Sequence, residues 1–170
     1  MPHSFVKLSA ARDEVRLQHL LERCSDYYEL HEGWSTPLDA GEYELKTDPN
    51  VAGGAELIAF ALQDGSDDSL AAMVQILKDA PERGTWWIGL FVVAPELRSR
   101  GFGSDLLRYL LAVAEEEGVT TVKLAVSSRN PRGLCFWERE GFVDTGVTAP
   151  VTARSGHVDT ALILFRAMTK

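Results

Sequence analysis

The chain contains little cysteine and no long apolar run. Its 170 residues include only two cysteines, Cys24 and Cys135, which are far apart in sequence and form no C-x-x-C pair. This pattern argues against a metal site or a disulfide framework and favours a reducing, cytoplasmic setting. No run of about 18 apolar residues occurs, so we expect no membrane-spanning helix and no membrane partner. The N-terminus also lacks the basic-then-apolar pattern of a secretory signal.

Basic charge is also scarce. The chain carries 17 Lys and Arg residues against 25 Asp and Glu residues, which gives a formal net charge of −8. Nucleic-acid phosphates require a basic protein surface, so we expect no nucleic-acid partner. The composition, 45% hydrophobic and 25% charged, is typical of a globular protein. A chain of this length fits one domain, residues 1–170, that buries a core of its own.

The hydrophobic pattern predicts a mixed α/β fold with one sheet. Residues 85–95 are almost entirely apolar, which is typical of a central strand that is buried on both faces. Residues 101–118 show apolar residues at helical spacing and end at a glycine. The full prediction places strands at 3–10, 54–69, 70–84, 85–95, 119–128, 142–151 and 157–168, helices at 11–33, 101–118 and 130–142, and a short helix plus loop at 35–50. The apolar spacing of 70–84 also fits a helix.

Local signals mark the ends and faces of three of these helices. Asn130 followed by Pro131 is typical of a helix start, because the asparagine caps the helix and the proline needs no hydrogen-bond partner there. Ser35 or Thr36 is the expected cap of the short helix ahead of Pro37. The apolar stripe of the helix at 11–33 is predicted to consist of Val15, Leu17, Leu20 and Leu21.

A basic, glycine-rich turn joins the strand at 85–95 to the helix at 101–118. The first turn of a helix has unpaired N–H groups and partial positive charge, and glycines let an anion approach the backbone closely. The turn lacks the lysine of a P-loop, which excludes that motif. It has Leu106 in place of the third glycine of a dinucleotide fingerprint, so that alternative is weak. A tight turn with solvated arginines remains the alternative without a ligand.

Two segments contain motifs with a defined spacing. The run Arg98-Ser99-Arg100-Gly101-Phe102-Gly103 matches the pattern R/Q-x-x-G-x-G/A. A helix and a strand later, a second segment is similar to the signature N-x-x-A-x-x-L-Y-x-x-x-G-F, through Asn130, Gly133, Phe136, Trp137, Gly141 and Phe142. Together these segments, about residues 86–142, resemble the GNAT superfamily of acyl-CoA-dependent N-acetyltransferases, in which the first pattern is the acyl-coenzyme A motif.

The resemblance implies a fold and a cosubstrate. The fold would be a single central, mostly antiparallel sheet with one splayed parallel strand pair, flanked by about four helices. Acetyl-CoA would bind with its pantetheine arm between the splayed strands, and Gly89 within a strand suggests a bulge or a close approach there. Arg129 and Arg132 are candidates for the 3′-phosphate. The implied cofactor-binding residues are Phe91, Val92, Val93, Arg98, Ser99, Arg100, Gly101, Phe102, Gly103, Ser104, Asn130 and Trp137.

The implied reaction is direct attack of an amine on the thioester in a ternary complex, with a small molecule, a peptide N-terminus or a lysine as acceptor. The family's usual tyrosine acid and glutamate base fall at Trp137 and Trp87, neither of which transfers protons, so the catalytic groups are unassigned. Candidates for proton transfer lie at 26–31, foremost Tyr28, Glu29 and His31. An alternative is that the enzyme only positions the two substrates and needs no acid, because a thiol with a pKa of about 8.5 leaves easily as its thiolate.

A catalytically silent acyl-CoA binding or sensing domain is the second hypothesis for the function. A homodimer is compatible with the resemblance.

Overall fold

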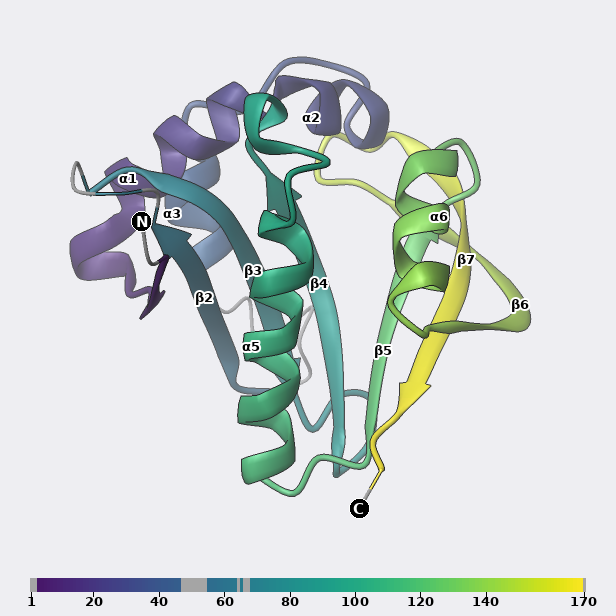
Figure 1. Cartoon of the computed structure of the whole chain (residues 1–170). Helices are drawn as coiled ribbons and strands as arrows, with labels where there is room; N and C mark the ends of the chain where they lie inside the picture. The colour runs from purple at the N-terminus through teal and green to yellow at the C-terminus, as the bar shows by residue number, and fades with distance from the viewer. Residues whose placement is uncertain (1–2, 47–54, 64, 66–67, 170) are drawn as a thin grey trace.

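Seven strands form one sheet in the order β1-β2-β3-β4-β5-β7-β6, in a computed structural model that describes residues 3–46, 55–63, 65 and 68–169 (Figure 1). The strands β4 and β5 pair in parallel, and the other neighbours pair antiparallel. The predicted mixed fold with one parallel pair is therefore confirmed. The strands are β1 (Ser4–Lys7), β2 (Leu57–Gln63), β3 (Leu70–Lys78), β4 (Thr85–Val93), β5 (Thr121–Ser127), β6 (Val143–Thr152) and β7 (Val158–Ala167).

Five α-helices are present in the described part of the chain, against about four expected. They are α1 (Ala10–Arg23), α2 (Ser25–His31), α3 (Ala40–Leu45), α5 (Phe102–Glu116) and α6 (Pro131–Arg139). Helices α5 and α6 lie over one face of the sheet, α1 and α3 lie behind β2 and β3, and α2 lies near the end of β4 (Figure 1). No helix in the described ranges is long and apolar enough to cross a membrane.

The core follows from the apolar strands that the sequence predicted. Strands β2, β3 and β4 occupy the middle of the sheet and are buried through most of their length. The side chains of α5 that pack on them recur at helical spacing, with Leu106, Leu107, Leu110 and Ala114 all buried. Strand β3 pairs with one edge of β4, while the other edge of β4 borders the opening described below.

The N-terminal helices differ from the prediction. The helix expected at 11–33 is broken at Cys24, whose N–H bonds back to Leu20 and Leu21 before α2 begins. Val15 was expected in the apolar stripe but is 61% exposed, and Asp13 is fully buried instead, where it accepts hydrogen bonds from Ser9 and Arg16. The charged residue is tolerated at a core-facing position because these donors satisfy it.

The short helix α3 also starts later than expected. Its N-cap residue is Asp39, whereas Ser35 or Thr36 was predicted, and the Thr36 hydroxyl donates to the Leu21 carbonyl of α1 instead. A tertiary contact therefore uses the hydroxyl that local sequence reasoning assigned to a cap. The far ends of the predicted segments 35–50 and 54–69 reach residues that lie outside the described part.

Candidate active site

The parallel strands β4 and β5 part along their length. Their pairing runs from Thr85 opposite Thr121 to Ile88 opposite Leu124 and stops there, although β4 stays paired with β3 as far as Val93. Gly89 is skipped in the β3–β4 register, because Gln75 pairs with Leu90 and the next residue, Ile76, pairs with Ile88. The bulge suspected at Gly89 is therefore present, and it lies where the strands diverge (Figure 1).

A cleft of about 860 Å³ opens at this divergence, between β4, β5, α6 and the glycine-rich turn. Most of the residues expected around acetyl-CoA line it, namely Phe91, Val92, Val93, Arg98, Ser99, Gly101, Gly103, Ser104, Asn130 and Trp137. Arg100 and Phe102 do not line it. The Phe102 side chain is buried and packs against His3, so only the backbone of this residue is available to a ligand in the cleft.

The turn that enters α5 is shaped for an anion. Ser99 and Gly101 have positive φ angles of 60° and 92°, which bring the chain sharply into the helix. Throughout the described part of the protein, no acceptor is found for the backbone N–H groups of residues 99–104, and the first paired one belongs to Asp105, which bonds to Gly101. Unpaired N–H groups at a helix start are the arrangement that binds phosphate groups elsewhere.

Gly103 allows β4 and α6 to approach this turn. A β-carbon at Gly103 would lie 3.3 Å from Phe136 and 3.4 Å from Val93, which is tight packing. A methyl group would require small shifts, and a longer side chain would have to enter the cleft. The turn therefore fits a ligand that meets bare backbone, as the resemblance implies for a diphosphate.

The Arg98 side chain is committed to protein partners. Its Nε donates to the Val93 carbonyl at 2.9 Å, and its guanidinium forms a two-point ion pair with Asp26 of α2. The hydrogen bond from Arg98 holds the pKa of Asp26 below its ordinary value. This arginine therefore ties the turn to the end of β4 and to α2, and positions the backbone that faces the cleft.

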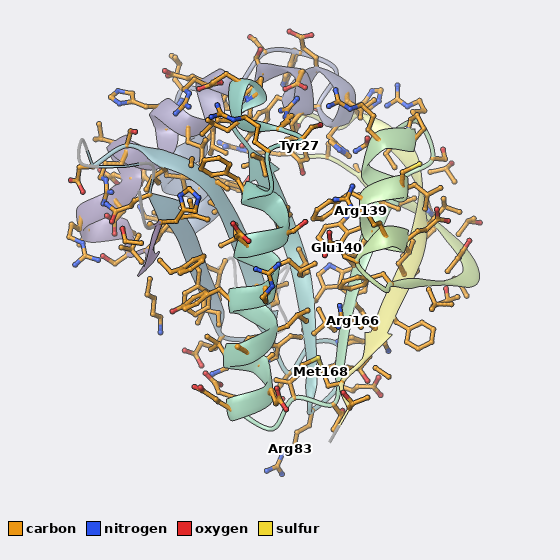
Figure 2. The ribbon with its side chains drawn as sticks, in the orientation of Figure 1. Tyr27, Arg83, Arg139, Glu140, Arg166 and Met168 are labelled. Atoms are coloured by element: carbon orange, nitrogen blue, oxygen red, sulfur yellow. The ribbon has the colours of Figure 1, made fainter. Side chains whose placement is uncertain are left out.

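The other polar side chains around the cleft differ in whether they are already paired with protein groups. The Ser104 hydroxyl donates to Glu140, and Figure 2 shows Glu140 and Arg139 along the opening between α5 and α6. Arg129 is paired with Asp159 and donates to the Leu30 carbonyl. Arg132 lines the cleft and, like Arg100, has no carboxylate partner within residues 3–46, 55–63, 65 and 68–169.

Helix α6 begins as the sequence predicts and presents aromatic side chains to the cleft. The Asn130 side chain accepts a hydrogen bond from the Gly133 N–H at 2.9 Å, which confirms its capping role. Trp137 is 7% exposed and packs edge-on against Phe91, Phe136 and Phe142. Its indole packs on the strand beside the cleft and has no acidic proton to offer.

The candidate proton-transfer residues separate into two groups. Tyr27 and His31 line the cleft with their rings 4.3 Å apart, and Tyr27 lies above the opening in Figure 2. Burial raises the pKa of Tyr27 above its ordinary value and lowers that of His31, so both are neutral near pH 7. Glu29 is exposed and Tyr28 is buried, and neither lines the cleft. Trp87 is half-buried and does not line it either.

One ionisable residue near the bulge was missed from the sequence. Glu44 of α3 accepts a hydrogen bond from the Gln75 side chain at 2.8 Å, and Gln75 lies over Gly89. Burial raises the pKa of Glu44 to about 7, although the Gln75 hydrogen bond opposes this. Gln75 is the only polar residue between Leu70 and Leu77 of β3. A lone polar side chain in a central strand was the available signal that a partner had to be near.

Comparisons with known proteins agree with this geometry. A family model described as the acetyltransferase (GNAT) family matches residues 16–142. A tRNA(Met) cytidine acetyltransferase, TmcA 2 of Saccharolobus solfataricus, is 32% identical over 113 residues. That match covers 63% of this chain and only 14% of the relative.

Solved structures resemble the whole fold. The ribosomal-protein-S18-alanine N-acetyltransferase of Escherichia coli superposes with a TM-score of 0.72 at 16% identity, over 99% of this chain and 96% of that one. The PaiA N-acetyltransferase of Thermoplasma acidophilum, solved in complex with coenzyme A, superposes with a TM-score of 0.68 at 14% identity, over 98% and 99% of the two chains. At these identities the likeness concerns the fold.

Proposed function

Since the chain belongs to the acetyltransferase (GNAT) family, we propose that it transfers an acetyl group from acetyl-CoA to an amine on a small molecule, a peptide N-terminus or a lysine. Residues 1–170 act in this proposal as one acyltransferase domain. That the protein is cytoplasmic and forms a homodimer are predictions from the sequence.

The early end of the β4–β5 pairing carries this proposal. Beyond Ile88, backbone groups of Gly89–Val93 that face β5 have no strand to pair with, and the cleft lies beside them. An extended pantetheine arm with its amide groups can pair with such an edge as an added strand. An N–H of this edge, near Val92, would stabilise the negative charge that develops on the thioester oxygen.

The turn at the start of α5 supplies the site for the diphosphate. We assign its binding to the unpaired N–H groups of residues 99–104, with Arg98 acting by holding the turn in place. Arg132 is the better candidate for the 3′-phosphate, because Arg129 is already paired with Asp159. Phe91 and Trp137 would pack against the apolar part of the arm.

An amine is the acceptor that the charges favour. Two carboxylates, Glu32 and Glu44, lie close enough to the cleft-lining Tyr27 to raise its pKa further. The chain as a whole carries a net charge of −8. Negative charge attracts an ammonium ion and repels a polynucleotide, so an RNA acceptor such as the one named for the archaeal relative is disfavoured here.

The second candidate is a domain that binds acetyl-CoA without turnover. It is favoured by the two tryptophans, Trp87 and Trp137, at the positions where the family's proton-transfer residues are expected. Such a domain would bind acetyl-CoA as tightly as an active transferase does, but it would acetylate no amine.

A thermal-shift series with acetyl-CoA, coenzyme A, NAD and ATP tests the binding step, because a ligand of the native state raises the unfolding midpoint. We expect a shift with the first two ligands only. We expect Gly103→Glu to abolish that shift, since it places bulk and negative charge among the unpaired N–H groups, while Gly103→Ala retains it. An unchanged shift in folded Gly103→Glu, or no shift with millimolar acetyl-CoA, contradicts the proposal.

Turnover separates the two candidates. Release of the coenzyme A thiol is followed with acetyl-CoA and three probes: spermidine, a peptide with a free N-terminus and a peptide with an internal lysine. Thiol release that depends on one of these amines supports the transferase. Binding without release in all three supports the silent domain.

A further inference from the structure

We propose that Glu44, held by Gln75 beside the Gly89 bulge, accepts the proton that the acceptor amine must lose before it attacks the thioester. The inference rests on the proposed function and names a residue for a step that Trp87 and Trp137 leave without one.

Glu44 lies on the face of the sheet opposite α5. Val74 pairs with Phe60, whose ring packs against Tyr109 of α5, so Val74 faces that helix. Its neighbour Gln75 must therefore face the other way, towards α3. There its amide donates to both the side chain and the backbone carbonyl of Glu44, each at 2.8 Å. The cofactor turn, by contrast, packs with Gly103 against Val93 on the α5 face.

The Gln75 amide also lies against the bulge. A β-carbon built on Gly89 would come within 2.4 Å of Gln75 Oε1, so a larger residue here would displace this side chain. Gly89 itself is exposed and lines the cleft, at the point where β4 leaves β5. The Glu44 carboxylate is therefore separated from the open edge of β4 by a single amide group. Neither Glu44 nor Gln75 lines the cleft itself, so in this proposal the proton of an amine at the open edge of β4 reaches the carboxylate through a water.

A buried hydroxyl lies next to Glu44. Tyr28 is 3% exposed, and burial raises its pKa. The negative charge of Glu44 raises the pKa of Tyr28 further, and Tyr28 in turn lowers the pKa of Glu44. The Tyr28 hydroxyl is therefore close enough to the Glu44 carboxylate to favour its charged form.

The chemistry requires such a group. An amine with a pKa of about 10 is almost entirely protonated near neutral pH and has no lone pair to attack with. One proton of the ammonium passes to Glu44, the nitrogen forms a bond to the carbonyl carbon, and the carbon–sulfur bond breaks. The second proton of the nitrogen ends on the coenzyme A thiolate. Glu44 returns its proton to water, so one proton is released for each acetyl group transferred.

The ionisation of Glu44 suits this role. Burial raises its pKa to about 7, and the residue keeps some contact with solvent, through which its proton can leave. A base with a pKa near the working pH is both ionised and basic enough to be effective. The groups that face Glu44 are Tyr27 and Tyr28 from α2, Glu32 at the end of α2, Gln75 from β3 and Arg154 from the β6–β7 turn. Helix α1 packs on α3 at Gly41 through Glu14 and Gln18.

The test compares Glu44→Gln with Glu42→Gln, using full-length protein and the probe amine that the wild type acetylates. Glu42 lies on the same helix but is exposed and paired with Lys46, so it is the matched control. For Glu44→Gln we expect kcat to fall by about 10²-fold or more, with the KM for acetyl-CoA and the thermal shift unchanged. The acidic limb of the pH profile, with a midpoint near 7 in the wild type, disappears. Glu42→Gln keeps both rate and profile.

Gln75→Met provides a second measurement that does not remove the base. The Gln75 hydrogen bond favours the charged form of Glu44, so its loss raises the pKa, and the acidic limb moves to higher pH. An unchanged pH profile in folded Glu44→Gln overturns the inference, as does loss of the limb in His31→Gln instead. A wild-type protein that binds acetyl-CoA and acetylates no amine overturns the proposed function and this step with it.

Discussion

The side chain of Arg98 connects three parts of the site, and its removal gives a quantitative test. The perturbation is Arg98→Met, which keeps the unbranched aliphatic stem and removes the guanidinium. The variant loses the hydrogen bond from Nε to the Val93 carbonyl and the two-point ion pair with Asp26. The turn into α5 then loses the side-chain hydrogen bonds that hold it to the end of β4 and to α2.

The two contacts contribute unequally. The Arg98 side chain is 24% exposed, so its charged hydrogen bond to a carbonyl is worth about 1.5–3 kcal/mol. Asp26 is 57% exposed, and solvent reduces the ion pair to about 0.2–1 kcal/mol. We therefore expect Arg98→Met to lower the free energy of unfolding by about 2–4 kcal/mol and Asp26→Asn by about 1 kcal/mol or less.

Urea unfolding of the wild type and both variants measures these differences, and each kcal/mol corresponds to roughly 2–4 °C in the thermal midpoint. We also expect acetyl-CoA to stabilise Arg98→Met less than the wild type, because the turn is no longer held. It should stabilise Asp26→Asn as much as the wild type. Equal destabilisation by the two variants would show that the ion pair dominates, and would refute the argument.

Two further predictions concern a buried carboxylate and the aromatic cluster. Burial alone would raise the pKa of Asp13, but hydrogen bonds from Ser9, Arg12 and Arg16 hold it below its ordinary value. Its contribution is therefore full above the unfolded pKa of about 3.9 and is lost as the pH falls below it. Asp13→Ala should lower the free energy of unfolding by about 2–3 kcal/mol at pH 7, with a smaller loss at pH 3, measured by urea unfolding. A loss that is constant across this range contradicts the assignment. Trp137→Phe should retain activity, far from the roughly 10²-fold loss that removal of a general acid causes. Trp137→Ala should destabilise the fold by about 3–5 kcal/mol, because the indole is buried in the aromatic cluster. A 10²-fold loss in folded Trp137→Phe, measured by thiol release, would give the indole a role beyond packing.

The local structure around the cleft could be predicted because its signals are local. The turn at 98–103, the Asn130 cap and the apolar spacing of α5 each depend on residues within one or two helical turns. Such features follow from backbone preferences that hold wherever the segment lies. Gly89 was equally informative, because a glycine in a buried strand usually marks a bulge or a close approach.

The N-terminal helices could not be predicted as well, because tertiary contacts override their local preferences. The break at Cys24 lets α2 turn so that Asp26 meets Arg98, 72 residues away. Asp13 is buried because Arg16 and the backbone of Ser9 satisfy it, which no hydrophobic periodicity reveals. The pairing of Glu44 with Gln75 likewise spans 31 residues and two elements. Only the isolated glutamine in β3 hinted at it.

Acetyl transfer to an amine needs a general base more than it needs a general acid. A coenzyme A thiolate, with a pKa of about 8.5, leaves without needing a proton at once, so a tryptophan at position 137 costs little. An ammonium group with a pKa of about 10 cannot attack until its proton is removed. A chain that has lost both usual groups can therefore remain an enzyme if another element supplies the base. Helix α3 places one carboxylate behind the Gln75 amide that lies over Gly89, on the face of the sheet opposite α5. The distinction between transferase and silent binding domain thus depends on whether Glu44 takes that proton.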